Sequence, residues 1–469
     1  MRFKPTPVQI PQDAPFKEDL LSRRQSAEVL TEFVASLMEP FVLAIDSPWG
    51  TGKTTFLKMW LPFLQNQGFH CLYFNAWEND FTESPLVSLI GEVGAEIDTL
   101  SLGDTNKTIA AIFQNTKKAG AALLKATIPA AVKLATSGLL DLSSLKEPEL
   151  GKIAEELAKK QIEKYQEDKK TLHHFRDGLA KLVKALAEAE DAKSAKPVIF
   201  VIDELDRCRP PYAIELLEKV KHLFSVEGLV FVLAVDRNQL GESVKSMYGA
   251  GMDADGYLRR FIDLEYRLPE PNTEAFVKAQ FNRFGLDVAL GEKHPNLRFE
   301  AHHLEEALSK LFSLFGFSLR AQEQCFTQLA IVVRTTPAQN YLFGYLLALL
   351  LCLRVAKRDL YSRYCRGDAT PESVMGYLRS LPGGEALMNT NFGCVIEAYL
   401  IFGIRDDQKR YSTVKAYREL ADSKDADKSK KEWARRVAEQ FEWIGRYTNN
   451  MTGYLYNKIE MAHRFVAPG

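Results

Sequence analysis

The sequence predicts an α/β fold in which helices cover both faces of a parallel β-sheet. Apolar runs of strand length occur at residues 41–45, 70–75, 197–202 and 229–235. Helical patterns separate these runs; in one of them Ile214, Leu217 and Val220 recur at helical spacing. Fully apolar strands that alternate with helices are typical of parallel sheets buried on both faces.

Composition places the chain among ordinary globular proteins and excludes several classes. A length of 469 residues predicts about two to four domains. The 60 Lys and Arg residues nearly balance 61 Asp and Glu residues, so the net charge gives no general attraction to nucleic acid, although local basic patches remain open. The six cysteines contain no C-x-x-C pair and the N-terminus lacks an apolar signal-peptide core. We therefore expect a cytoplasmic protein.

The N-terminal part leads into the first strand through one helix. Residues 1–16 carry four prolines and are expected to be extended. The next segment places Ala27, Leu30 and Val34 on one helical stripe before the strand at 41–45. Helical patterns also follow that strand up to Gly68 and return at 85–100.

Residues 102–194 differ in character from the rest. They are rich in Ala, Leu, Lys and Glu, and lysines interrupt every apolar run before it approaches the ~20 residues of a membrane span. We expect amphipathic helices inserted into the α/β region. A packed helical appendage is the favoured interpretation, and contact with a membrane surface or a partner helix is the alternative.

The segment between the first strand and its following helix has the pattern of a phosphate-binding loop. Residues 44–55 read A-I-D-S-P-W-G-T-G-K-T-T. Loop amides and the helix N-terminus would hold phosphate oxygens, Lys53 would reach the β- and γ-phosphates, and the Thr54 hydroxyl would ligate Mg²⁺. An ordinary glycine-rich turn is the alternative. The residues expected to line the nucleotide are Ser47, Pro48, Trp49, Gly50, Thr51, Gly52, Lys53, Thr54 and Thr55.

Acidic residues follow the two later strands. Asp203 and Glu204 end the strand at 197–202, where Asp203 would hold Mg²⁺ through water and Glu204 would polarise an attacking water. A helix-capping cluster is the alternative, with Asp206 as part of it. Asp236 directly follows the strand at 229–235. It could sense the γ-phosphate or cap the next helix, and the two roles are compatible.

Beyond Pro269 and Pro271 the pattern is helical almost to the C-terminus, and the 13 apolar residues at 341–353 predict a buried core helix. We expect residues 1–270 to form the nucleotide-binding core, with its insertion at 102–194. Residues 271–469 would form a helical lid and a C-terminal helical domain.

Taken together, these stretches resemble the KAP family of P-loop NTPases. The resemblance covers residues 16–340, apart from the insertion, and is carried by D-L-L-S-R at 19–23, S-P-W-G-T-G-K-T at 47–54, F-N-A-W-E at 74–78, I-D-E-L-D-R-C at 202–208, V-L-A-V-D-R at 232–237 and Y-L-R-R-F-I at 257–262. Three residues depart from the family pattern: Ser47 and Ser22 replace glycines, and Glu204 replaces a common aspartate.

The resemblance implies roles for three arginines. Arg23, with the preceding residues from 18, would belong to the adenine pocket. Arg260 would reach the phosphate of a neighbouring subunit, and Arg320 would contact the γ-phosphate from the helical lid. For Arg260 and Arg320 a surface salt bridge is the alternative. Trp77 is expected to pack at the end of its strand.

The resemblance also implies a function. The chain would bind and hydrolyse ATP with Mg²⁺ and drive conformational change in a partner assembly, through self-association and operon-encoded protein partners. The soluble bacterial branch of the family implies anti-phage defence. Two alternatives stay open: a membrane-associated scaffold switched by nucleotide, and a DNA-acting motor or loader.

Overall fold

The computed structural model describes residues 9–82, 84–99, 105–126, 163, 169–187, 196–223, 225–293, 298–337, 340–444 and 451–464. The chain divides into two compact units, here called the sheet unit (Gln9–Pro269) and the helical unit (from Glu270). Each is described by itself.

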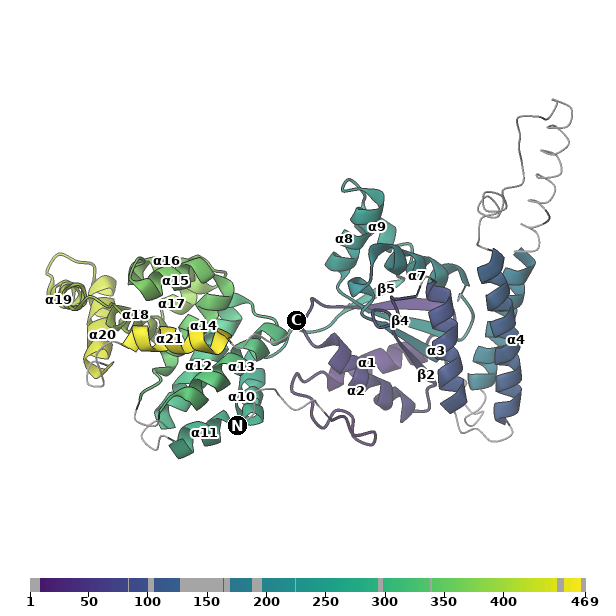
Figure 1. Cartoon of the computed structure of the whole chain (residues 1–469), viewed down its shortest axis with the longest axis horizontal. Coiled ribbons are helices and arrows are strands. Elements are labelled where there is room, and N and C mark those ends of the chain that lie inside the picture. The colour runs from purple at the N-terminus through teal and green to yellow at the C-terminus, as the bar shows by residue number, and fades with distance from the viewer. Residues whose placement is uncertain are drawn as a thin grey trace, which may run out of the picture. The chain divides into compact units, whose positions relative to one another are not determined.

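The sheet unit contains a five-stranded sheet in the order β2-β3-β4-β1-β5, with every neighbouring pair parallel (Figure 1). The strands are β1 (Phe41–Asp46), β2 (Cys71–Asn75), β3 (Val198–Asp203), β4 (Leu229–Val235) and β5 (Leu264–Arg267). The parallel sheet and its helical cover confirm the fold class predicted from the sequence.

Helices cover both faces of the sheet because successive side chains of the buried strands point to opposite sides. Leu43 and Ile45 of β1 pack in one apolar cluster with α1 (Arg24–Ala35) and α2 (Lys53–Gln65). Val42 and Ala44 pack in a second cluster on the other face. That second face is covered by α3 (Pro85–Thr99), α7 (Pro210–Leu223), α8 (Arg237–Tyr248) and α9 (Ala254–Leu258).

The described parts of the predicted insertion at 102–194 are α4 (Thr105–Ala126), residue 163 and a helix over residues 169–187. Ile109 and Phe113 of α4 and Phe175 of the helix at 169–187 are buried in the second cluster. These helices therefore pack on the sheet unit. The remainder of the insertion lies outside the described residues.

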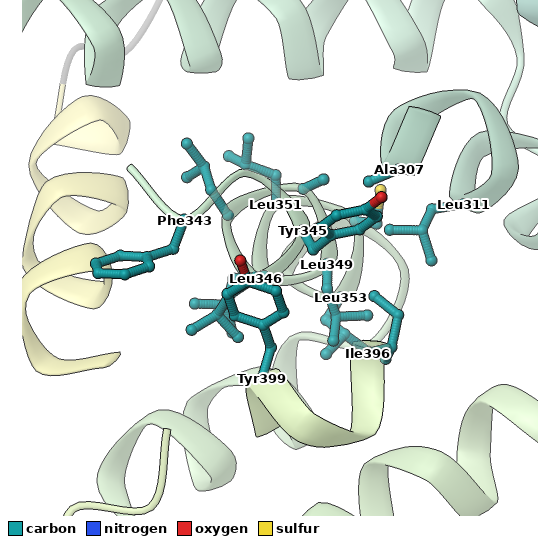
Figure 2. Close-up of a cluster of buried hydrophobic side chains, with 14 of the residues drawn as sticks. Ala307, Leu311, Phe343, Tyr345, Leu346, Leu349, Leu351, Leu353, Ile396 and Tyr399 are labelled. Carbon is teal, nitrogen blue, oxygen red and sulfur yellow. The ribbon is translucent and has the colours of Figure 1, made fainter. Parts of the chain in front are cut away.

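The helical unit is built around α14 (Gly344–Ala356), whose residues from Gly344 to Leu353 are all buried. Figure 2 shows its side chains pointing in several directions around the helix axis, toward Leu311 of α12 (Arg298–Phe315) and Tyr399 of α18 (Asn391–Phe402). The prediction of a buried core helix in this stretch is confirmed, although the helix begins at Gly344 rather than at 341 and extends to Ala356. The helices of this unit are α10 (Thr273–Phe284), α11 (Leu286–Lys293), α12 (Arg298–Phe315), α13 (Leu319–Thr335), α14, α15 (Arg358–Arg366), α16 (Pro371–Ser380), α17 (Gly384–Met388), α18 (Asn391–Phe402), α19 (Asp407–Asp422), α20 (Lys428–Ile444) and α21 (Met451–Arg464).

Within the described ranges, none of the helices combines the length and apolar composition that a membrane span requires.

Candidate functional site

The loop between β1 and α2 presents backbone N–H groups at the start of a helix. Gly50 has φ 76° and Gly52 has φ 89°, a left-handed conformation that favours glycine. The first hydrogen bond of α2 runs from the Phe56 amide to the Gly52 carbonyl at 3.0 Å. The preceding amides, from Lys53 to Thr55, therefore have no acceptor one turn earlier and can donate to a bound anion.

Ser47 stands at the position of the first glycine of the phosphate-loop pattern. Its φ is negative, since it is absent from the described residues with positive φ, so an L-amino acid fits there without strain. Its hydroxyl lies 2.7 Å from that of Thr51 and its side chain is buried. The turn thus uses a hydroxyl pair where the general pattern uses glycine.

Lys53 lies inside the loop and is only 8% exposed. Its ammonium donates to the carbonyls of Ser47 and, at 3.3 Å, of Pro48. Burial lowers the pKa of Lys53, and nearby carboxylates oppose this effect. Those carboxylates belong to Asp206, Asp236, Asp203 and Asp46. One ammonium among four carboxylates leaves a local excess of negative charge, which favours a cation beside any bound phosphate.

Asp203 ends β3 and is 1% exposed. Burial raises the pKa of its carboxyl, whereas hydrogen bonds from the Thr54 and Tyr73 side chains oppose the rise. The Tyr73 hydroxyl donates to it at 3.0 Å. Tyr73 was not predicted, because a tyrosine in the middle of a strand carries no motif signal.

Thr54 and Asp203 supply the oxygen atoms that Mg²⁺ prefers. In the part of the chain that the structure describes, no cluster of three or more His, Cys, Asp or Glu residues could hold a metal ion by itself. Magnesium commonly binds through one or two protein oxygens together with substrate phosphates and water. These residues fit that arrangement.

Glu204 has φ 60°, a left-handed conformation that is unusual for a residue other than glycine. Its carboxylate pairs with Arg207 at 2.7 Å and accepts a hydrogen bond from the Asn75 amide nitrogen at 3.3 Å. The Arg207 guanidinium lies 5.6 Å from the centre of the Trp77 ring. The expectation that Trp77 packs at the end of its strand is wrong: it is 53% exposed, because the strand ends at Asn75 and Trp77 lies in the following turn.

Asp236 and Asp206 tie the loop to β4. Asp236 caps α8, accepting from the Asn238 and Gln239 amides, and its other oxygen accepts the Trp49 amide at 3.1 Å. The capping interpretation is confirmed; sensing of the γ-phosphate stays a prediction. Asp206, which the alternative interpretation placed in a helix-capping cluster, accepts hydrogen bonds from the Trp49 indole and, at 3.0 Å, from the Asp236 amide.

The predicted arginines lie in three different places. Arg23 is 1% exposed, and its guanidinium donates to the Thr51 and Gly52 carbonyls of the loop. Arg260 follows α9 and is exposed, and no ion pair with it is found among the described residues. Arg320 lies exposed in the first turn of α13, in the helical unit. Phosphate contacts by Arg260 and Arg320 stay predictions.

Sheet order brings the loop and the acidic residues together. β4 pairs with β1 on one side and with β3 on the other, all parallel, so the carboxyl ends of the three strands lie at one edge. The loop follows β1, Asp203 ends β3 and Asp236 follows β4. Strand order, loop and acidic edge together define a P-loop nucleotide-binding domain.

Comparison with known proteins specifies this class. Residues 23–334, more than half of the chain, match the KAP family P-loop domain. The chain therefore belongs to the KAP family of P-loop domains.

Solved structures similar to the chain include two of the ORC2 protein of Aeropyrum pernix. Its ADPNP-ADP complexes match with 12% identity and a TM-score of 0.31, over 94% of this chain and 93% of that chain. Its ADP form matches with 12% identity and a TM-score of 0.30, over 98% and 96%. A search of curated proteins finds no match.

Proposed function

We propose that this protein is a Mg²⁺-dependent ATPase. The observation that carries the proposal is the convergence of Lys53, Thr54, Asp203 and Glu204 at one edge of the sheet, beside free amides at the start of α2. A phosphate loop binds nucleotide, and an acidic pair at the end of β3 adds a metal ligand and a base for hydrolysis.

Each residue has a role that follows from its position. The loop amides and Lys53 hold the phosphates, and the ammonium exchanges its loop carbonyls for phosphate oxygens. Thr54 and, through water, Asp203 would hold a Mg²⁺ ion, which would supply positive charge against the charge that develops on the phosphates. Glu204 orients the attacking water and accepts its proton. Asp236 holds the loop through the Trp49 amide, and we propose that it also senses the γ-phosphate.

Phosphate release from ATP and binding of mant-ATP test the proposal in the purified chain. Lys53→Ala should abolish binding, whereas Lys58→Ala, an exposed lysine of the same helix, should leave it unchanged. Glu204→Gln should bind nucleotide and release phosphate at least about 100-fold more slowly, the usual effect of losing a general base. Turnover by Glu204→Gln at the wild-type rate would contradict the proposed base, and absence of binding by the wild type would contradict the whole proposal.

We further propose that the ATPase cycle drives conformational change in an assembly of protein partners that protects bacteria from phage. Support comes from the resemblance of the motifs to the soluble bacterial branch of the family. Deletion of the gene from a host that carries the complete operon should raise phage plating, and Lys53→Ala should have the same effect. Unchanged plating across a broad phage panel would argue against a defence role.

A further inference from the structure

Arg23 is a buried charged side chain beside the phosphate loop, and its hydrogen-bond partners among the described residues are main-chain carbonyls rather than carboxylates. Its Nη2 donates to the Thr51 carbonyl at 2.8 Å and its Nη1 to the Gly52 carbonyl at 3.2 Å. Nη2 also reaches the carbonyl of Pro269 at 3.4 Å, 246 residues further along the chain. Pro269 is the last residue of the sheet unit, before the helical unit starts at Glu270. One guanidinium thus holds the loop and the exit of the sheet unit together.

Several hydrogen bonds hold this buried cation and the turn that carries it in place. Burial lowers the pKa of Arg23 to about 10, with opposing effects from Asp19 and Tyr266, so the guanidinium stays charged at neutral pH. Within the described residues its hydrogen bonds all go to main-chain carbonyls, and its buried Nε has no acceptor. Asp19 in turn accepts the amides of Leu21, Arg23 and Arg24, which fixes the turn that carries the arginine. A buried cation without an ion-pair hydrogen bond is unfavourable unless such contacts compensate it.

The segment that leaves the sheet unit has a second attachment at the same place. The Leu268 amide donates to the Asp46 carbonyl at 3.2 Å, and β5 pairs with β1 immediately before it. Asp46 is the last residue of β1 and precedes the loop. Residues 268–269 are therefore held both at the start of the loop, through Asp46, and near its end, through Arg23.

We infer that Arg23 is a positioning residue that couples the phosphate loop to the segment entering the helical unit. The inference rests on the proposed nucleotide binding and adds a route by which binding at the loop changes the position of the segment that leaves the sheet unit. A phosphate that draws the loop amides toward itself moves the Thr51 and Gly52 carbonyls, since each carbonyl shares a peptide plane with the next amide. The rigid planar guanidinium follows those carbonyls and shifts its contact with Pro269. A lysine would not do this, because it is a point charge on a flexible stem.

Hydrogen exchange of the full-length chain tests the coupling, with Arg23→Lys compared with Arg24→Lys. Arg24 is the neighbouring residue, exposed and paired with Glu28. In the nucleotide-free protein, Arg23→Lys should speed exchange at the Leu268 amide, which donates to Asp46, by about tenfold, the size expected for lost hydrogen bonds to a charged group. Arg24→Lys should leave this amide unchanged, and slow exchange in β4 of each variant shows that the sheet unit is folded.

A second comparison uses saturating mant-ATP with Mg²⁺. In the wild type, nucleotide should change exchange at both the loop and the Leu268 amide; in Arg23→Lys it should change the loop alone. A wild type that binds mant-ATP without any response at Leu268 overturns the inference, even if Arg23→Lys fails to fold. Unchanged exchange at Leu268 in nucleotide-free Arg23→Lys also overturns it. That comparison needs no nucleotide, so failure of the coupling is distinguished from failure of ATP binding.

Discussion

Glu300 offers a sharp test of the energetics of the helical unit. It lies on α12, is 7% exposed, and accepts the amide N–H of Gly344, the first residue of the buried helix α14. Burial raises the pKa of this carboxyl from 4.5 to about 7, although the hydrogen bond from Gly344 opposes the rise. Tyr345 and Tyr399 face the same carboxyl, and their own pKa values are raised, so they stay neutral across this range.

The direction of the pH effect on stability follows from the protonation of Glu300 in the folded and unfolded chain. Between pH 4.5 and about 7 the unfolded chain has ionised Glu300 while the folded chain keeps it protonated. The folded state therefore binds more protons, and its stability falls as the pH rises through this window, with no further change above about pH 7. At 1.36 kcal/mol for each unit between the two pKa values, the loss is about 3 kcal/mol.

Glu300→Gln removes this titration and keeps a carbonyl oxygen for the Gly344 amide. At pH 5 the variant should be more stable than the wild type by only about 1 kcal/mol, and at pH 8 by about 3 kcal/mol. Urea unfolding followed by hydrogen exchange in α14 reports on this unit, with Glu305→Gln of the same helix as the control. Equal differences at the two pH values, or a variant less stable at pH 8, would refute the reasoning.

Three further predictions concern the loop and its approach. Ser22 has φ 54°, so Ser22→Gly should stabilise the sheet unit by roughly 1 kcal/mol by relieving a left-handed serine. Ser47→Gly should instead destabilise the sheet unit by roughly 1–2 kcal/mol, because the variant loses the hydroxyl pair with Thr51 and its unfolded chain has more conformational entropy. Thermal denaturation measures both, and shifts of the same sign would contradict this contrast. Asp206→Ala leaves the Trp49 indole without its acceptor and should weaken mant-ATP binding about tenfold; unchanged affinity would show that the loop does not need this contact.

The sequence predicted four of the five strands closely, because each is an apolar run of the right length. β5 was missed, because Leu264 to Arg267 are exposed or only partly buried and three of these four residues are polar or charged. Such an edge strand has no pattern of its own and exists through its pairing with β1.

The same distinction applies to the candidate site. Lys53, Thr54 and Asp203 were predicted, because a phosphate loop and a strand-end acid are local patterns. The contacts of Glu204 with Asn75 and Arg207 were not predicted, nor was the hydrogen bond from Tyr73 to Asp203. Asn75 and Tyr73 come from a neighbouring strand, and only the register of β2 against β3 places them there.

By itself, then, the sequence determined the class of fold and the candidate residues for phosphate chemistry, since both depend on short-range spacing and apolar periodicity. Only the tertiary structure decided that β4 lies between β1 and β3, that Asp206 and Asp236 hold Trp49, and that Arg23 joins the loop to Pro269. These contacts link residues more than 150 positions apart. Their partners are chosen by strand order and register, which no local pattern encodes.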